Sequence, residues 1–210
     1  MSGRREEILE TAGSMFSEQF EKSSMETAQR CEKQCSTIAE NFLKALGQIM
    51  DQAVCKEDES GEDEVQYLLF SCLHSSIFLK KYFIRIDLMG PGLYMNAPLA
   101  VSYWDAGDIY GLFEKDIEEI RRKTGKRIPR LREYETDYIR YAYAPYYQRM
   151  AKAFIREMID GLLEGSQVPE RQTEEEKQVK ILFGEYMGEA DILFSIGREK
   201  FYEILQDICR

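Results

Sequence analysis

The stretch from Val65 to Asp105 is the most apolar part of the chain, and it constrains the fold most strongly. In its first part, residues 65–79, apolar side chains surround any helical axis, which is typical of a buried helix. The run is too short for a membrane span, which needs about 20 predominantly apolar residues, and Gln66 and His74 are too polar for one. We therefore expect residues 65–79 to form the central core helix, and we predict no membrane association.

A short strand is expected directly after this helix. From Tyr82 to Leu88, apolar and charged residues alternate with period two, which predicts a half-buried strand. Gly90-Pro91-Gly92 then favours a turn, and Leu93–Met95 is able to return as the paired strand. An isolated hairpin is barely stable in water, so this one must pack on helices. The predicted fold class is therefore mainly α, a helical bundle with one small β-hairpin at about residues 82–95 packed on it.

Length and charge indicate one globular domain. A chain of 210 residues with 44% hydrophobic and 31% charged residues is long enough for one substantial core, so we predict a single domain over residues 1–210. The net charge of −10 repels polyanions unless cations gather in one place. Five cysteines without a CxxC motif or a signal peptide favour reduced thiols and a cytoplasmic location. Further helices are expected through Ile181–Phe183 and, last, from Arg198 to Ile208.

Residues 1–55 are expected to form a helical N-terminal segment, followed by an acidic linker at 56–64. A capping box at Ser23–Glu26 favours a second helix that starts there. Beyond it, apolar residues follow a heptad seam that packs either on a partner copy or on the protein's own core. The seam consists of Ala28, Cys31, Cys35, Ile38, Phe42, Ala45 and Ile49, of which Ile38 and Phe42 are candidate partner-binding residues.

The run ILETAGSMFSEQFEKSSMETAQRCEKQCSTIAENF, residues 8–42, resembles the helix-turn-helix of TetR-type transcriptional regulators. Ile8, Leu9, Ala12 and Phe16 match the first helix of that family, Ser23, Ser24 and Met25 the start of its second helix, and Thr37, Ile38 and Phe42 its recognition helix. The resemblance implies N-terminal helices that touch DNA and a remainder that binds a ligand and dimerises. Residues 1–55 hold six Lys and Arg against nine Asp and Glu, so a nucleic-acid partner is considered but not favoured.

The only basic concentration in the sequence runs from Arg121 to Arg132, with seven cations and no acid. Such a run suits a phosphate, a nucleic-acid backbone or an acidic partner surface. The alternative is a solvated loop whose first cations complement a helix C-terminus, and the run lacks interleaved aromatic residues for base stacking. The candidate anion-binding residues are Arg121, Arg122, Lys126, Arg127 and Arg130.

Six tyrosines follow between Tyr134 and Tyr147. Tyr134, Tyr138 and Tyr141 share one helical face, and tyrosine suits a boundary where the ring is buried and the hydroxyl is solvated. Core packing is the commoner use of such a stripe. These three tyrosines are nevertheless candidate partner-binding residues.

Signals for catalysis are weak. His74 is the only histidine, and Cys31 and Cys35 lack the further ligands that a zinc site needs. Three carboxylates lie beside large apolar groups and could act as acids or bases: Asp87, Asp105 and Asp137, the last with Arg140 nearby. No P-loop, HExxH or GxSxG motif is present, so we assign no catalytic residue, metal or cofactor.

The favoured function is a non-enzymatic intracellular binding or regulatory protein that acts through helical protein–protein contacts. We expect a protein partner or a homo-oligomer, and a small-molecule ligand stays open. One alternative is a degenerate TetR-like, ligand-responsive regulator. A second alternative is a hydrolase or transferase that uses a carboxylate such as Asp105 or Asp137.

Overall fold

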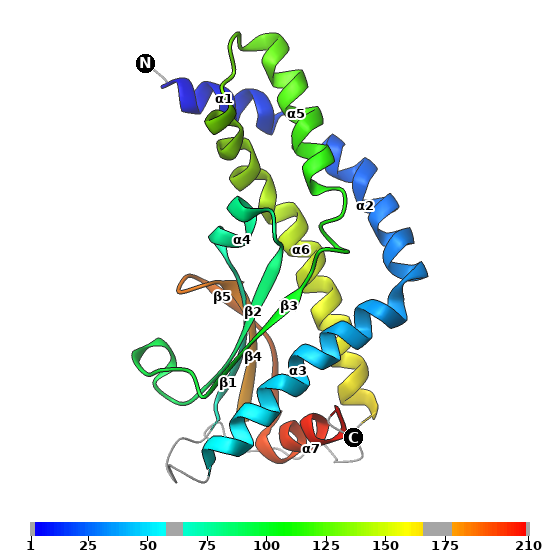
Figure 1. The fold of residues 1–210 in the computed structure, drawn as a ribbon, viewed down its shortest axis with the longest axis vertical. Coiled ribbons are helices and arrows are strands. Elements are labelled where there is room, and N and C mark those ends of the chain that lie inside the picture. Colours follow the sequence, from blue (N-terminus) through cyan, green and yellow to red (C-terminus); the bar gives the residue numbers. More distant parts are fainter. Residues whose placement is uncertain (1–2, 58–64, 166–177, 209–210) are drawn as a thin grey trace. The chain divides into compact units, whose positions relative to one another are not determined.

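The computed structural model describes residues 3–57, 65–165 and 178–208, which form two compact units (Figure 1). We call them the helical unit and the sheet unit. The helical unit comprises Met1–Cys35, His74–Tyr82 and Ala106–Lys152, and the sheet unit comprises Ser36–Leu73, Phe83–Asp105 and Ala153–Arg210. Within the described residues, the elements in chain order are α1 (Arg4–Gly13), α2 (Phe16–Lys33), α3 (Cys35–Glu57), β1 (Tyr67–Cys72), α4 (His74–Leu79), β2 (Phe83–Met89), the 3-10 helix η1 (Leu93–Met95), β3 (Ala100–Asp105), α5 (Phe113–Arg127), α6 (Glu133–Gly165), β4 (Gln178–Glu185), β5 (Ala190–Gly197) and α7 (Arg198–Ile208).

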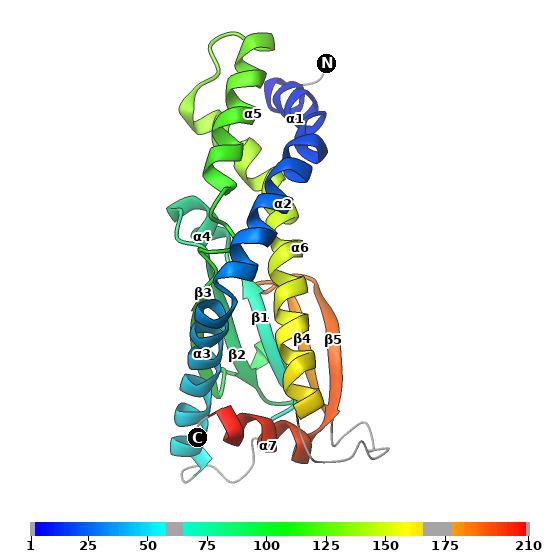
Figure 2. The same cartoon turned by 90° about the vertical axis from the view of Figure 1, so that its right-hand side faces the viewer.

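The sheet unit is built on a five-stranded mixed sheet in the order β3-β2-β1-β4-β5. Strand β1 runs parallel to β4, and every other neighbouring pair is antiparallel. Figures 1 and 2 show α3 and the last part of α6 on the same face of this sheet. Aromatic rings fill the layer between them: Phe42 of α3 stacks on Phe70 of β1 at 5.8 Å and meets Trp104 of β3 edge-on at 5.2 Å.

The sheet has one blocked edge. The side-chain amide of Gln52 on α3 donates to the carbonyl of Val101 at 2.9 Å, and the Val101 N–H donates to the Gln52 carbonyl oxygen at 3.1 Å. Gln52 thus makes the pair of hydrogen bonds that a neighbouring strand would make to β3 at this position.

The prediction of a helical bundle with one hairpin is wrong, because the sheet has five strands and the chain is an α/β fold. Residues 65–79 do not form one helix: they form the central strand β1 and then the short helix α4. A central strand is buried on both faces, as the 1% exposure of both Leu68 and Leu69 shows. Such a strand reads as a continuous apolar run, which periodicity cannot distinguish from a buried helix.

The predicted strand at Tyr82–Leu88 is confirmed as β2, but its partner is wrong. Leu93–Met95 forms the 3-10 helix η1, while β2 pairs with β1 and β3. Residues 181–183 lie in β4 rather than in a helix, and the last predicted helix is confirmed as α7.

The helical unit packs α1, α2, α4 and α5 with the first part of α6. Its buried apolar side chains include Ile8, Ala12, Phe16, Phe113, Ile117, Ile120, Ile139, Tyr143 and Tyr147. No helix of the described residues is long and apolar enough to cross a membrane.

The N-terminal segment differs from expectation in where it breaks. Residue Ser23 lies inside α2 and starts no helix. The segment breaks at Ser14–Met15, between α1 and α2, and at Gln34, between α2 and α3. Ile38 and Phe42 are almost completely buried in the sheet unit, so this part of the heptad seam packs on the chain's own core. Most of the predicted acidic linker, residues 58–64, lies outside the described residues.

We predict that Phe42→Ala lowers the free energy of unfolding by about 4 kcal/mol, because it removes a buried ring and leaves a cavity beside Phe70 and Trp104. Urea denaturation followed by circular dichroism measures the change. Thr37→Ala, an exposed position on the same helix, is the control and should change stability by less than about 0.5 kcal/mol. A loss below about 1 kcal/mol for Phe42→Ala would contradict the packing described here.

Candidate functional site

A buried carboxylate holds three helices of the helical unit together. Asp116 on α5 is only 1% exposed and accepts four hydrogen bonds. Its Oδ1 accepts from Ser23 Oγ at 2.5 Å and from Gln19 Nε2 at 2.9 Å, both on α2. Its Oδ2 accepts from the hydroxyls of Tyr143 at 2.9 Å and Tyr147 at 2.7 Å, both on α6. These bonds fix α2 and α6 against α5.

The donors to Asp116 are all neutral, so hydrogen bonds rather than a counter-ion satisfy the carboxylate. Burial, with the nearby Asp116 carboxylate, raises the pKa of Tyr143 and of Tyr147 well above the ordinary value of 10. Both phenols therefore stay protonated and keep donating throughout the neutral range.

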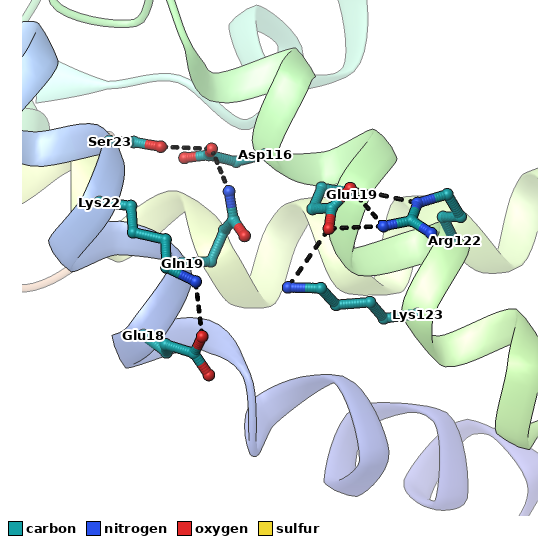
Figure 3. Close-up of polar contacts among 8 residues, drawn as sticks. All are labelled: Glu18, Gln19, Lys22, Ser23, Asp116, Glu119, Arg122 and Lys123. Atoms are coloured by element: carbon teal, nitrogen blue, oxygen red, sulfur yellow. Dashed lines mark hydrogen bonds and ion pairs between the residues drawn. The ribbon is translucent and has the colours of Figure 1, made fainter.

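An open groove of about 420 Å³ lies beside this cluster, between α2 and α5 (Figure 3). Gln19 joins the two features, because it lines the groove and donates to Asp116. The other lining residues are charged: Lys22, Lys115, Glu118, Glu119, Arg122 and Lys123. Glu119 is paired with Arg122 at 2.7 Å and with Lys123 at 3.3 Å, so part of this charge is already neutralised.

Cations follow one face of α5 through the groove and past it. Lys115, Arg122 and Lys126 are spaced seven and four residues apart, which places them on nearly the same face of the helix. All three side chains are exposed. The stripe leads from the groove to the C-terminal end of α5, where cations also complement the helix dipole.

The turn after α5 is held in place by an ion pair between the exposed Arg4 and the buried Glu135. Arg4 on α1 donates through Nε to Glu135 at 2.5 Å and through Nη2 to the carbonyl of Arg130 at 3.1 Å. Glu135 in turn accepts from the backbone N–H of Arg132 at 2.7 Å. Arg130 itself has φ of +57°, a left-handed conformation that is unusual for a residue with a side chain. We call this arrangement the Arg4–Glu135 clamp.

The clamp changes the proton affinity of Glu135. Hydrogen bonds from Arg4, and then from the backbone of Arg132, lower the pKa of Glu135 to about 2. The carboxylate therefore stays ionised, and the clamp stays closed, over the whole physiological range.

Tyrosines from the start of α6 adjoin the clamped turn. Tyr134 is 53% exposed, and its ring meets that of Tyr138 edge-on at 6.3 Å. The guanidinium of Arg5 lies over the other ring, 5.2 Å from the centroid of Tyr138. Arg5, Tyr138 and Tyr134 thus form a short ladder of alternating contacts beside the basic turn.

The predicted anion-binding residues and two of the three predicted tyrosines, Tyr134 and Tyr138, therefore lie at one end of the helical unit. Figure 1 shows α1, the end of α5 and the start of α6 together there. All five predicted anion-binding residues are exposed, and among the described residues only Arg122 of these five makes a side-chain ion pair. We call this surface the cationic end; it comprises Arg4, Arg5, Arg121, Arg122, Lys126, Arg127, Arg130, Arg132, Tyr134 and Tyr138.

Charge is divided unequally between the two units. The helical unit holds 18 Lys and Arg against 15 Asp and Glu, a formal charge of +3. The sheet unit holds 10 against 23, a formal charge of −13. The overall acidity of the chain therefore belongs to the sheet unit, and the net charge alone does not exclude an acidic partner for the helical unit.

The other predicted residues lie elsewhere. Tyr141 is half-buried and contacts the exposed His74, with ring centroids 5.5 Å apart. Asp137 pairs with Arg140 at 2.5 Å, as expected from their spacing, and Arg140 also makes a two-fold contact to Glu114. Burial would raise the pKa of Glu114, but the hydrogen bonds from Arg140 and Tyr82 outweigh it and lower the pKa.

The two strand carboxylates have different surroundings. Asp87 is buried on β2 and pairs with Arg85 of the same strand at 2.7 Å. Asp105 is exposed at the end of β3. Among residues 3–57, 65–165 and 178–208, no group of three or more His, Cys, Asp or Glu is arranged to hold a metal ion.

Sequence reasoning missed Asp116, Arg4 and Glu135. Asp116 could have been found, because it falls on the inward stripe of α5 between Phe113 and Ile117, where a charge needs partners. The Arg4–Glu135 clamp joins residues 131 positions apart, and no local pattern indicates it.

We predict that Asp116→Asn lowers the free energy of unfolding by about 3 kcal/mol, because the amide nitrogen would face two buried donors that lose their acceptor. Urea denaturation measures the loss. Glu118→Gln, an exposed carboxylate on the same helix, should change stability by less than about 0.5 kcal/mol. If both variants were equally stable, Asp116 would not hold the three helices together.

We also predict that the contribution of Glu135 to stability depends on pH. Its pKa is about 2 when folded and near the ordinary 4.5 when unfolded, so the contribution is complete above about 4.5 and is lost as the pH falls towards 2. The difference in urea midpoint between the native protein and Glu135→Gln should therefore shrink over that interval. The exposed neighbour Glu133 provides the control, Glu133→Gln, for which a constant, small difference is expected. A difference for Glu135→Gln that does not change with pH would refute the clamp.

No family model matches this chain, and neither does any curated protein or solved structure. The resemblance of residues 8–42 to TetR-type regulators stays a prediction. The surface chemistry of the helical unit is the basis on which a function is inferred.

Proposed function

We propose that this chain is a non-enzymatic binding or regulatory protein that contacts an acidic macromolecule through the cationic end of its helical unit. The observation that carries the proposal is the Arg4–Glu135 clamp. It fixes the backbone of a turn whose own cationic side chains, Arg127 at one end and Arg130 within it, are left exposed.

A merely solvated loop needs no such clamp. Burying the Glu135 carboxylate carries a desolvation cost, which here is offset by the Arg4 guanidinium and the Arg132 backbone N–H. What the clamp provides is a turn that is already ordered before a partner arrives. Preorganisation reduces the entropy lost on binding and so favours affinity.

Arginine predominates among the cations of this surface. Its planar guanidinium binds carboxylates and phosphates through two parallel hydrogen bonds, and it is hydrated more weakly than an ammonium group. Arg121, Arg127 and Arg130 make no ion pair with a described residue, so their donors are available to a partner.

This surface is a better candidate for partner binding than the heptad seam. Ile38 and Phe42 are buried against the sheet, while Tyr134 and Tyr138 adjoin the clamped turn. Tyrosine and arginine are both enriched where proteins bind their partners.

A binding role is also favoured over acid–base catalysis. Asp87 and Asp137 are each satisfied by an arginine, and ion pairing of this kind is the usual structural use of a carboxylate. Asp105 is exposed at the end of β3, which is an ordinary position for a surface carboxylate.

We predict that Arg127→Ala combined with Arg130→Ala weakens polyanion binding at least about fivefold, because two charge contacts are lost. Fluorescence anisotropy with labelled heparin at about 50 and 200 mM salt measures the affinity, and the variant should also show a shallower salt dependence.

A matched control removes two exposed cations from the sheet unit, Lys44→Ala with Arg156→Ala, and should leave binding unchanged. Equal losses in both double variants would show that only the general charge of the chain matters. That result, or no binding by the native protein, would contradict the proposal.

A further inference from the structure

We infer that the acidic macromolecule is a single-stranded nucleic acid, whose bases stack at Tyr134 while its phosphates meet the arginines of the clamped turn. This inference rests on the proposed function and names the class of partner. It follows from the aromatic ladder that the fold builds beside the cations.

The ladder supplies what the basic run lacks in sequence. Between Arg121 and Arg132 there is no aromatic residue, but the structure places Tyr134 directly after the turn, with Tyr138 one helical turn further along. Arg5 of α1, which is far from these tyrosines in the sequence, stacks over Tyr138. A planar base has two faces that stack on exposed aromatic rings and on guanidinium groups alike.

The exposure of Tyr134 supports a stacking role. The residue is 53% exposed, although the adjoining Glu135 and Thr136 are almost fully buried. The ring of Tyr138 meets the Tyr134 ring edge-on, with the centroids 6.3 Å apart. A stacked base would cover apolar ring surface that water now contacts.

The turn also offers phosphate ligands at more than one position. It spans residues 128–132, with Arg127 directly before it and Arg130 within it, and both arginine side chains are exposed. The clamp fixes the spacing between them.

A single strand fits these features better than an acidic protein segment or a duplex. Carboxylate side chains have no aromatic face to stack on Tyr134, so an acidic peptide would use the arginines alone. The bases of a duplex are already stacked on one another, so the ring would gain no contact without local opening.

The test uses the full chain and three labelled probes: a 15-nucleotide oligothymidylate, a duplex of the same length and poly-L-glutamate. The variants are Tyr134→Ala, Tyr134→Phe and the control Tyr103→Ala, which removes a tyrosine of similar exposure from β3 in the sheet unit. Circular dichroism melting confirms that each variant is folded.

Tyr134→Ala should weaken oligothymidylate binding about tenfold, because one base–ring stack is lost. Tyr134→Phe should retain binding within about twofold, since the ring persists, and Tyr103→Ala should have no effect. Poly-L-glutamate binding, if observed, should not change in Tyr134→Ala.

Other outcomes overturn the inference in distinguishable ways. If poly-L-glutamate binds as tightly as oligothymidylate and Tyr134→Ala affects neither, the single-strand inference fails while the proposed acidic-partner function stands. Tighter binding of the duplex than of the single strand would also overturn the inference. If no probe binds, both the inference and the proposed function fail.

Discussion

The helical unit depends on the Asp116 carboxylate. This buried charge is satisfied by hydrogen bonds from four neutral donors and not by a counter-ion. A buried ion pair would have required an arginine or lysine inside the helical core. Here two hydroxyl-bearing tyrosines, one serine and one glutamine do the same work and come in pairs four residues apart along α2 and α6. Each pair presents adjacent donors from one helical face. No cation is needed beside Asp116, and the exposed cations of the unit lie at the cationic end and along the groove.

The fold could be predicted only where periodicity is unambiguous. Strand β2 alternates clearly because one of its faces carries Arg85 and Asp87, and α7 has a regular amphipathic stripe. Strand β1 could not be recognised, because it lies in the middle of the sheet with both of its faces buried, and this burial removes the alternation. If residues 65–79 are read as a helix, β1 is not available as a partner of β2, and the pattern indicates a hairpin with the nearby Leu93–Met95 instead. The parallel pairing of β1 with β4 joins residues over a hundred positions apart, and no local signal encodes it.

In the candidate site, too, features within one helix could be predicted from the sequence, whereas contacts between residues far apart in the sequence could not. The exposed cations of residues 121–130 and the tyrosine face were visible as composition and as spacing along one helix. Their convergence was not, because Arg4 and Arg5 reach them from the other end of this unit's sequence. Ile38 and Phe42 illustrate the reverse problem, since a heptad seam has the same pattern whether it faces a partner helix or the chain's own sheet. Only the neighbours of Phe42, above all Phe70 and Trp104, decide between the two.

The side-chain amide of Gln52 is hydrogen-bonded to the backbone of Val101, and this makes the two edges of the sheet different. At the β3 edge, Gln52 already occupies backbone groups to which another strand would bind. The opposite edge of the sheet is β5. Any lengthening of the sheet by a foreign or identical strand would therefore proceed from β5 and in one direction. If two copies paired through their β5 strands, the β3 edge blocked by Gln52 would form both outer edges of the joint sheet. No further copy could then add a strand, and assembly would end at the dimer.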